Sequence, residues 1–337
     1  MRQLLDKLFL HQSLDREEAR EVMGGIADQR FPDAQIAAFL AIYRMRPVTV
    51  VELSGFRDAL IDRAVSLQLD RQDLLDIVGT GGDGKKTFNI STTSAFVAAG
   101  AGVPIIKHGS FGVSSPVGSS NVLQALGVPF TVDSDIINRQ LEHAGISFLH
   151  APICHPAMKA VVPVRKALAI PTLFNALGPL LNPARPRYSV LGTATLEQAR
   201  TYHYVLQDAG QEYAVVHALD GYDEISLTGT TQVFRQGTQA QLPPSAFGLK
   251  PVRPESLVGP DQPDQAAKVL LAILEGKAPR EQEDVVCANA ALAINLHRPD
   301  TSLPDAVDLA RESIHRGNAR RSLHLLLHPT ATPIRVG

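Results

Sequence analysis

A short apolar run that leads into a cluster of glycines constrains this chain more than any other feature. The run is Leu74-Leu75-Asp76-Ile77-Val78, and the cluster is Gly79-Thr80-Gly81-Gly82-Asp83-Gly84. The run predicts a buried strand because it is short, apolar and bounded by turn residues. Glycines let the backbone approach a ligand closely because no Cβ stands in the way. The sequence therefore predicts a sheet with an anion-binding loop at the end of one strand.

Strand-like and helix-like segments alternate after the glycine cluster. Such alternation indicates a mainly parallel sheet with helices on its faces. We expect strands at 74–78, 104–107, 146–149, 188–191, 214–217 and 231–235, and helices at 91–99, 121–126, 133–144, 156–168 and 196–209.

The two ends of the chain show helical patterns instead. Asp15 with Glu18, and Thr49 with Glu52, have the spacing of capping boxes at helix starts. Residues from 262 onward are again mostly helical, after a Pro- and Gln-rich surface excursion at 237–264. We expect an α/β protein with a small N-terminal helical domain and a larger α/β domain that has a mainly parallel central sheet. The expected ranges are 1–70, with a returning segment at 163–185, and 71–337.

Composition narrows the class of protein. A length of 337 residues suggests about two domains, and 45% apolar with 20% charged residues excludes a disordered chain. The net charge of −2 argues against a nucleic-acid-binding protein. Two cysteines exclude a disulfide framework or a zinc cluster, and no apolar run approaches the roughly 20 residues of a membrane span. We expect a cytoplasmic protein without a membrane or nucleic-acid partner.

Two common nucleotide-binding motifs almost fit the glycine cluster. Gly79, Gly81 and Gly84 satisfy G-x-G-x-x-G, but a dinucleotide site also needs an acid at the end of the next strand, which here ends at Lys107. A P-loop needs Ser or Thr where this chain has Lys86. Each motif therefore fails at one defined residue.

A phosphate-binding site of another kind fits better. Backbone N–H groups of the glycine loop and of the following helix start would face an anion. A second Gly/Ser-rich loop follows the strand that ends at Lys107. Two donor-rich loops at neighbouring strand ends indicate a ligand with more than one phosphate group. The side-chain donors are Thr87, Asn89, Ser91, Thr92, Lys107, Ser114, Ser115 and Ser119.

These runs resemble the anthranilate phosphoribosyltransferase family. The glycine loop with Asp83, the run Thr87-Phe88-Asn89-Ile90-Ser91-Thr92 and the run Lys107-His108-Gly109 carry the resemblance. The matches cover residues 1 to about 330 in order. They continue with His155-Pro156-Ala157-Met158, Pro163-Val164-Arg165, Phe174-Asn175-Ala176-Leu177-Gly178-Pro179-Leu180, Asn182-Pro183 and Asp223-Glu224-Ile225-Ser226.

The resemblance implies a fold and a reaction. The fold is the class IV phosphoribosyltransferase fold, which nucleoside phosphorylases share, usually as a homodimer that contacts through the helical domains. The reaction transfers phosphoribosyl from phosphoribosyl pyrophosphate to the amino group of anthranilate and releases pyrophosphate, a step of tryptophan synthesis. Its cofactor is Mg²⁺. No covalent nucleophile and no general acid or base is assigned.

The resemblance also implies site residues. Asp223 and Glu224, taken alone, have the pattern of a solvated loop, and adjacent carboxylates also suit Mg²⁺. The family implies the metal-binding role, with ligands Ser91, Asp223 and Glu224. It implies that anthranilate contacts Gly79, Ser110 and Arg165, whose guanidinium can bind a carboxylate through two hydrogen bonds. The implied contacts of phosphoribosyl pyrophosphate are Gly79, Gly82, Asp83, Thr87, Asn89, Ile90, Ser91, Thr92, Lys107, Ser115 and Ser119.

The chain departs from the family pattern on the acceptor side. Ser110 and Phe111 stand where Asn and Arg are common, Asn121 where Asp is common, and Pro171 where Arg is common. These changes leave open a pyrimidine nucleoside phosphorylase-like enzyme or a non-enzymatic nucleic-acid-binding relative. The roles of His108 and His155 also stay open, as hydrogen-bonding or core residues.

Overall fold

The helices at the amino end begin where the sequence predicts. The computed structural model describes residues 1–112 and 117–328. Asp15 accepts a hydrogen bond from the Glu18 N–H, Thr49 accepts one from the Glu52 N–H, and both capping boxes are complete. The four helices are α1 (Arg2–Phe9), α2 (Arg16–Ala27), α3 (Asp33–Met45) and α4 (Val50–Ile61).

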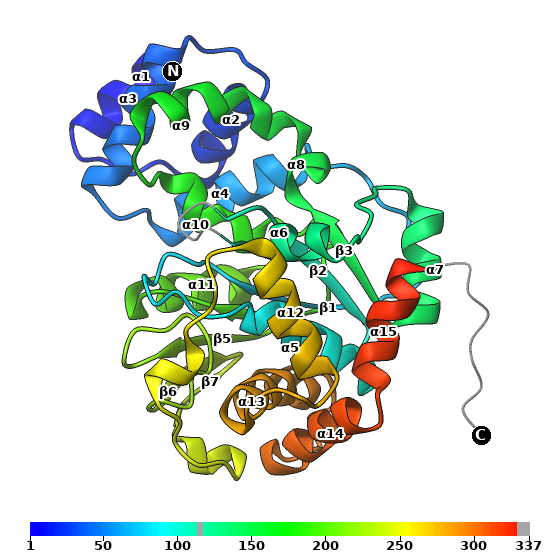
Figure 1. Ribbon diagram of the computed structural model, residues 1–337. Helices are drawn as coiled ribbons and strands as arrows, with labels where there is room; N and C mark the ends of the chain where they lie inside the picture. The colour runs from blue at the N-terminus through cyan, green and yellow to red at the C-terminus, as the bar shows by residue number, and fades with distance from the viewer. Residues whose placement is uncertain (113–116, 329–337) are drawn as a thin grey trace.

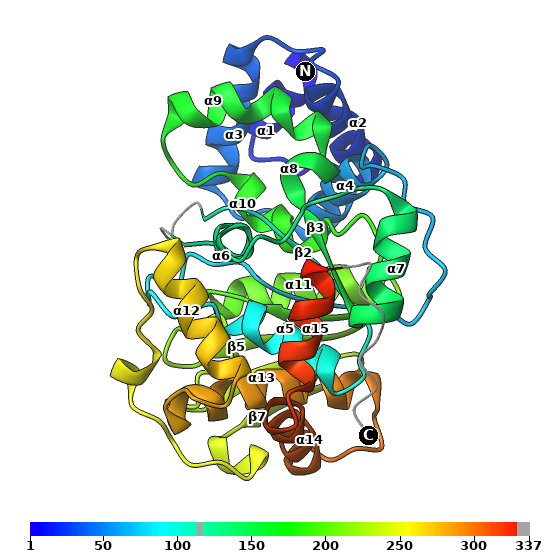
Figure 2. The ribbon, with the colours of Figure 1, turned by 45° about the vertical axis from the view of Figure 1, so that its right-hand side comes forward.

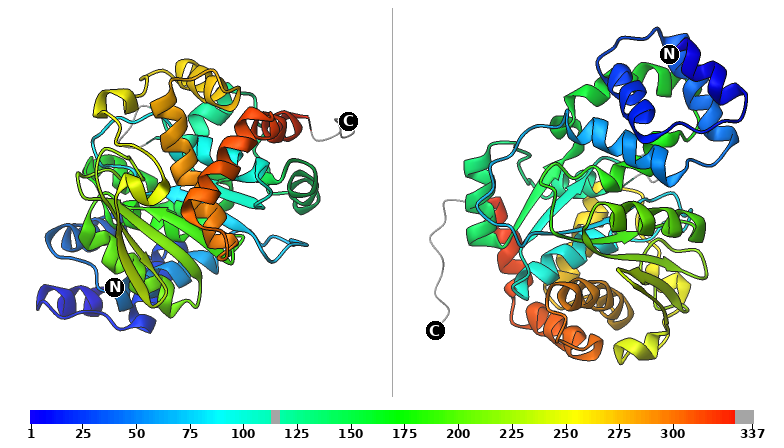
Figure 3. Two further views of the ribbon diagram at one scale, coloured as in Figure 1. Left: turned by 90° about the horizontal axis from the view of Figure 1, so that it is seen from below. Right: turned by 180° about the vertical axis from the view of Figure 1, so that it is seen from behind.

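Two later helices join these four in space. Phe39, Tyr43 and Phe56 form edge-to-face ring contacts 5.0–5.7 Å apart at the centre of the bundle. Helices α9 (Val162–Leu168) and α10 (Leu173–Leu177) place Val164 and Leu177 in the same apolar cluster. Figure 1 shows α9 and α10 in green among the blue N-terminal helices, and the view from behind in Figure 3 shows the same arrangement. This packing supports the predicted return at 163–185; the boundary at residue 70 stays a prediction.

The predicted mainly parallel sheet is confirmed. Within the described residues, seven strands form one sheet in the order β3-β2-β1-β4-β5-β6-β7. The pairs from β3 to β5 are parallel, and β6 and β7 add two antiparallel pairs at one edge. The strands are β1 (Leu75–Gly79), β2 (Ile105–Gly109), β3 (Ile146–His150), β4 (Tyr188–Gly192), β5 (Glu212–Ala218), β6 (Thr231–Arg235) and β7 (Thr238–Leu242).

Helices cover both faces of this sheet because alternate strand residues point to opposite sides. Leu75 and Ile77 of β1 belong to the larger apolar core, whereas Val78 belongs to the cluster shared with the helical domain. Helix α11 (Leu196–Asp208) packs on the second side together with α4. Figure 2 shows the C-terminal helices beside α5 on the first side. That side carries α5 (Ile90–Gly100), α6 (Ser119–Ala125), α12 (Pro263–Leu274), α13 (Arg280–His297), α14 (Leu303–His315) and α15 (Asn318–Leu327). Helix α7 (Ser134–Ala144) packs Ile137 and Leu141 against Ile106 and Leu149, in a third, smaller apolar cluster.

Two details differ from the sequence expectation. The helix expected at 156–168 is broken into α8 (Ala151–Cys154), a 3₁₀ helix (Pro156–Val161) and α9, because prolines begin new turns and lack an N–H donor. The excursion at 237–264 contains β7 and the short 3₁₀ helices Pro244–Phe247 and Pro254–Leu257. In the described ranges no helix is long and apolar enough to cross a membrane.

Candidate functional site

The two glycines that end β1 and β4 mark the candidate site. Gly79 pairs with Gly192 at the carboxyl ends of these neighbouring strands. The chain runs from β1 outward to β2 and β3, then returns to β4 on the other side of β1. This reversal makes a topological switch point, where open α/β sheets bind their ligands.

The glycine loop leaves β1 in conformations that favour glycine. Gly81, Gly82 and Gly84 have φ angles of +63°, +79° and +74°, where a Cβ would be strained. The loop leads to the start of α5, a helix of 11 residues whose N-terminal N–H groups face the same edge. Asp83 turns back and accepts a hydrogen bond from the Lys85 N–H at 3.0 Å. The loop therefore has the glycine conformations of a tight turn, and its anion-binding role stays a prediction.

The acid pair from the loop after β5 closes over this region. Asp223 Oδ2 accepts a hydrogen bond of 2.7 Å from the Gly81 N–H. Glu224 Oε1 accepts one of 2.8 Å from the Ser91 N–H and another from the Ser91 hydroxyl. The structure thus brings together Ser91, Asp223 and Glu224, the three residues expected to hold a metal.

Two glycines at the strand ends lie close to Asp223, Gly79 to its side chain and Gly192 to its backbone. A Cβ on Gly79 would lie 2.7 Å from Asp223 Oδ2, and a Cβ on Gly192 would lie 1.6 Å from the Asp223 carbonyl oxygen. The next residue but one, Ile225, is held by Asn289 of α13 through both its N–H and its carbonyl, at 3.0 and 2.8 Å. The acid loop therefore rests directly on two strand ends and is anchored from behind.

Negative charge is concentrated at this point. Burial, reinforced by the charge of Asp83, raises the pKa of Asp223. Burial, reinforced by Asp223, raises the pKa of Glu224. A bound cation would lower both pKa values, since it favours the ionised carboxylates. The donor set consists of carboxylate and hydroxyl oxygens, which suits Mg²⁺.

The carboxylates at this site are few, as Mg²⁺ sites with a phosphate ligand require. Across residues 1–112 and 117–328, no group of three or more His, Cys, Asp and Glu side chains is arranged to hold a metal ion by itself. Mg²⁺ commonly uses one or two carboxylates and completes its shell with substrate phosphates and water. The residues present fit that ion in combination with a phosphate ligand.

The second loop approaches the same edge from β2. Ser119 begins α6 and donates to the Ser110 carbonyl at 3.3 Å, and a Cβ on Gly109 would lie 2.4 Å from Ser119 Oγ. Asn89, at the start of α5, donates to the Val117 carbonyl at 3.2 Å and so ties the two loops together. Ser114 and Ser115 lie outside the described residues.

The remaining predicted phosphate ligands occupy different positions. Thr87 lies 3.5 Å from Glu224 Oε2, whereas Thr92 is buried in the first turn of α5. Ile90 is fully buried in the apolar core, and its N–H is donated to the Phe88 carbonyl. Lys107 is 3% exposed, and its ammonium group donates to the Ile77 carbonyl.

The predicted acceptor residues come from two domains. Arg165 of α9 lies 3.5 Å from Asn175 Oδ1 and 5.6 Å from the ring centre of Phe174. Burial lowers the pKa of Arg165, whose charge has no carboxylate partner among the described residues. Ser110 directly follows Gly109, the last residue of β2. The Arg165 guanidinium is therefore available to the carboxylate of an aromatic ligand.

The two histidines left open by the sequence lie together. The rings of His108 and His155 are 5.3 Å apart, edge to face. His155 Nε2 is hydrogen-bonded to the Leu181 carbonyl at 2.7 Å, whereas His108 Nε2 is buried without a partner among the described residues. Burial lowers the pKa of both, which favours their neutral forms.

Phe111 packs differently from the arginine common at its position. Its ring meets the His150 ring edge to face at 4.8 Å, and Phe130 stacks on the His150 ring at 4.4 Å. His150 Nδ1 is hydrogen-bonded to Ser120 Oγ at 2.8 Å. The substitution therefore replaces a charge with an aromatic contact that supports the start of α6.

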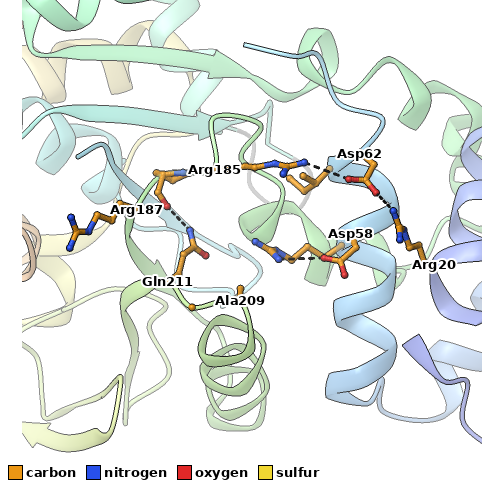
Figure 4. Close-up of a pocket in the computed structure, with 11 residues that line it drawn as sticks. Arg20, Asp58, Asp62, Arg185, Arg187, Ala209 and Gln211 are labelled. Atoms are coloured by element: carbon orange, nitrogen blue, oxygen red, sulfur yellow. Dashed lines mark hydrogen bonds and ion pairs between the residues drawn. The ribbon is translucent and has the colours of Figure 1, made fainter. Parts of the chain in front are cut away.

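A cavity of about 490 Å³ lies at the opposite, amino ends of β4 and β5. Figure 4 shows Arg20 and Arg185 directed at Asp62, with distances of 2.7 and 3.5 Å. Asp58 is likewise paired with Arg57 and with Arg16. Because these guanidinium groups face carboxylates of the helical domain, their charges are already paired; Arg16 also reaches Asp208 of α11, at 2.8 Å.

Comparisons with known proteins agree with this geometry. Residues 71–320 match the model described as the α/β domain of a glycosyl transferase family, and residues 2–64 match its helical bundle domain. A protein of Cytophaga hutchinsonii named anthranilate phosphoribosyltransferase is 49% identical, over 95% of this chain and 97% of that one.

Solved structures give the same result. The anthranilate phosphoribosyltransferase of Thermus thermophilus superposes with a TM-score of 0.90 at 35% identity, covering 96% of this chain and 98% of that one. The enzyme of that name from Saccharomyces cerevisiae, in complex with phosphoribosyl pyrophosphate and Mg, superposes with a TM-score of 0.90 at 30% identity and covers 96% of both chains.

Proposed function

Because this chain belongs to the anthranilate phosphoribosyltransferase family, we propose that it transfers the phosphoribosyl group of phosphoribosyl pyrophosphate to the amino group of anthranilate, with Mg²⁺ as cofactor. The products are N-(5-phosphoribosyl)anthranilate and pyrophosphate, as in tryptophan synthesis. Its relatives do not favour a nucleoside phosphorylase or a nucleic-acid-binding protein.

One observation carries this proposal: the acids Asp223 and Glu224 contact both the glycine loop and the start of α5. A nucleoside phosphorylase, which uses inorganic phosphate, has no need of this acid pair for a diphosphate. The contacts join residues more than 130 positions apart in the chain. They bring carboxylate oxygens next to N–H groups that suit phosphate oxygens.

The donor side of the reaction is assigned to the loops at the strand ends. N–H groups of the glycine loop, Asn89, the α5 start, Lys107 and Ser119 would hold the phosphates. Mg²⁺ at Asp223, Glu224 and Ser91 would supply charge that stabilises the departing pyrophosphate. The chain's own dipoles are fixed before the substrate arrives, so they stabilise developing charge without reorganising.

The acceptor side is assigned to the interface between the domains. Arg165 would bind the anthranilate carboxylate and so point the amino group toward the ribose carbon. The aniline nitrogen is a nucleophile when neutral, and His108 and His155 are held neutral by burial. Holding the two reactants in line replaces a bimolecular encounter, and no side chain is assigned as a general base.

We also propose a homodimer formed through the helical domains. Phe9 and Leu10 at the end of α1 are 60% and 71% exposed, and Met45 at the end of α3 is 87% exposed. Val162 and Ile170, in and after α9, extend the apolar surface, since α3 contacts both α1 and α9. Contiguous exposed apolar surface marks protein–protein contacts.

The cytoplasm is proposed as the compartment, because both buried cysteines are free thiols.

The test of the activity uses the fluorescence of anthranilate. Purified protein is mixed with anthranilate, phosphoribosyl pyrophosphate and Mg²⁺, and the expected result is loss of anthranilate fluorescence with matching release of pyrophosphate. Omission of Mg²⁺ is expected to abolish the reaction. Absence of turnover with anthranilate, together with phosphate-dependent cleavage of a pyrimidine nucleoside, would overturn the proposal.

A further inference from the structure

Strands β1 and β2 separate directly below the candidate site. In the described part of the chain they pair at Leu75 and Ile105. By contrast, β1 stays paired with β4 as far as Gly79 and Gly192. Buried backbone N–H and carbonyl groups need partners, so separated strands need substitutes for the missing ladder bonds.

Three polar side chains supply these substitutes. Asp76 Oδ1 accepts a hydrogen bond of 3.1 Å from the His108 N–H. Asn182 donates through Nδ2 to the Ile106 carbonyl at 2.9 Å and to Asp76 Oδ2 at 2.8 Å. The Lys107 ammonium donates to the Ile77 carbonyl. The gap between β1 and β2 is therefore filled by a hydrogen-bonded wedge of Asp76, Asn182 and Lys107.

The wedge also contains two opposite charges away from water. Asp76 is 1% exposed and Lys107 is 3% exposed. Burial lowers the pKa of Lys107, and the Asp76 charge is the largest influence that opposes this; Glu224 is the next. No ion pair joins these two side chains among the described residues, because the Lys107 ammonium donates to Ile77 while Asp76 accepts from other partners. The position of Lys107 therefore depends on hydrogen bonds that hold its neighbours in β2, at the His108 N–H and the Ile106 carbonyl.

We propose that Asp76 is a positioning residue for the phosphate site. Its carboxylate accepts from the His108 N–H and from Asn182, which also donates to the Ile106 carbonyl. Asp76 thereby fixes the backbone on both sides of Lys107 at the carboxyl edge of the sheet. The inference rests on the proposed function in one respect, since it takes Lys107 as a contact of phosphoribosyl pyrophosphate. Neither the glycine motif nor the acid pair indicates this role for Asp76.

A double-mutant cycle tests the inference. Asp76→Asn, Lys107→Met and the double variant are compared with the unmodified protein, and the dissociation constant of phosphoribosyl pyrophosphate is measured by calorimetry with Mg²⁺ present. If Asp76 acts through Lys107, Asp76→Asn weakens binding by about tenfold or more in the unmodified background and by less than about twofold in the Lys107→Met background. The same factor in both backgrounds would overturn the inference.

Steady-state kinetics and stability give independent readouts. The Michaelis constant for phosphoribosyl pyrophosphate should rise in Asp76→Asn, while that for anthranilate stays within about twofold. Asp76→Asn should also lower the melting temperature, because an amide offers one acceptor oxygen where the carboxylate accepts from two N–H donors. An unchanged melting temperature for Asp76→Asn would contradict the role of the carboxylate in the wedge.

A matched control and the separation of the two proposals complete the design. Glu52→Gln removes another fully buried carboxylate, paired with Arg46 in the helical domain, and should lower stability while leaving the dissociation constant unchanged within about twofold. If the unmodified protein fails to consume anthranilate, the proposed function is refuted. The calorimetric binding of phosphoribosyl pyrophosphate would still test the positioning role of Asp76 in that case. If the enzyme is active but the effects of Asp76→Asn and Lys107→Met on binding simply add, only the positioning role of Asp76 is refuted.

Discussion

Gly192→Ala is expected to disable the site without touching a ligand. Gly192 ends β4, and an added Cβ would stand 1.6 Å from the Asp223 carbonyl oxygen and 2.8 Å from its carbon. An ordinary contact begins at 3.4 Å, so the Asp223 backbone would have to retreat by about 2 Å. The atoms in the way are backbone, which cannot rotate aside as a side chain can.

The loop has no easy route for this retreat. Ile225 is fixed by two hydrogen bonds to Asn289, and the Tyr222 carbonyl accepts one of 3.0 Å from the Ala218 N–H. The shift must therefore break the 2.7 Å bond between the Gly81 N–H and Asp223 or distort the end of β4. A misplacement of about 1 Å can cost about 10²-fold in rate, and overpacking costs about 1–3 kcal/mol of stability.

The assay is initial-rate loss of anthranilate fluorescence at saturating phosphoribosyl pyrophosphate and Mg²⁺. We expect kcat to fall by about 10²-fold or more. Gly229→Ala is the matched control, because it lies in the same loop and its Cβ would meet nothing closer than 3.6 Å. A folded Gly192→Ala protein whose kcat stays within about threefold of normal would refute the steric reasoning.

Three further changes test other parts of the molecule. Arg165→Ala should raise the Michaelis constant for anthranilate by about tenfold or more and affect that for phosphoribosyl pyrophosphate much less; steady-state kinetics would show the opposite pattern if Arg165 served the phosphates. Met45→Glu should convert the proposed dimer to a monomer, as measured by light scattering. The control is Tyr204→Glu, which changes an exposed residue of α11 in the other domain and should leave the dimer intact. A dimer in both variants would disprove the proposed surface. Although burial opposes it, hydrogen bonds from Arg46 and from backbone N–H groups lower the pKa of Glu52. The stability lost in Glu52→Gln should therefore be largest above about pH 4.3, the ordinary Glu value. This loss of stability should shrink as the pH falls below that value, because the carboxylate becomes protonated. Thermal unfolding measured across this pH range checks the prediction, and a loss that does not depend on pH would contradict it.

Local signals made much of the fold predictable. Capping residues such as Asp15 and Thr49 act within one helical turn, and apolar runs such as 74–78 mark buried strands by themselves. The glycine loop was likewise predictable, because a cluster of glycines after an apolar run marks a turn. The positive φ angles of Gly81, Gly82 and Gly84 agree with that signal. The resemblance added the acid pair, which by spacing alone had the pattern of a solvated loop.

Contacts between distant residues were not predictable in this way. The wedge of Asp76, Asn182 and Lys107 depends on two strands separating, and no local pattern encodes a missing ladder pair. Asn289 looks like any polar residue in a helix, yet it anchors the acid loop across 64 residues. The short strand β7 was missed because Thr238–Leu242 is exposed and polar, so neither apolar alternation nor a buried run marks it.

The central claim is that Asp223 and Glu224 serve the transfer reaction through a bound metal ion at the switch point of the sheet. The most direct measurement is the turnover of the Asp223→Asn, Glu224→Gln double variant at fixed Mg²⁺, with circular dichroism as the check of folding. Our account predicts a fall of about 10²-fold or more, because both charged oxygen ligands are lost at once. Near-normal turnover by the folded double variant would contradict it.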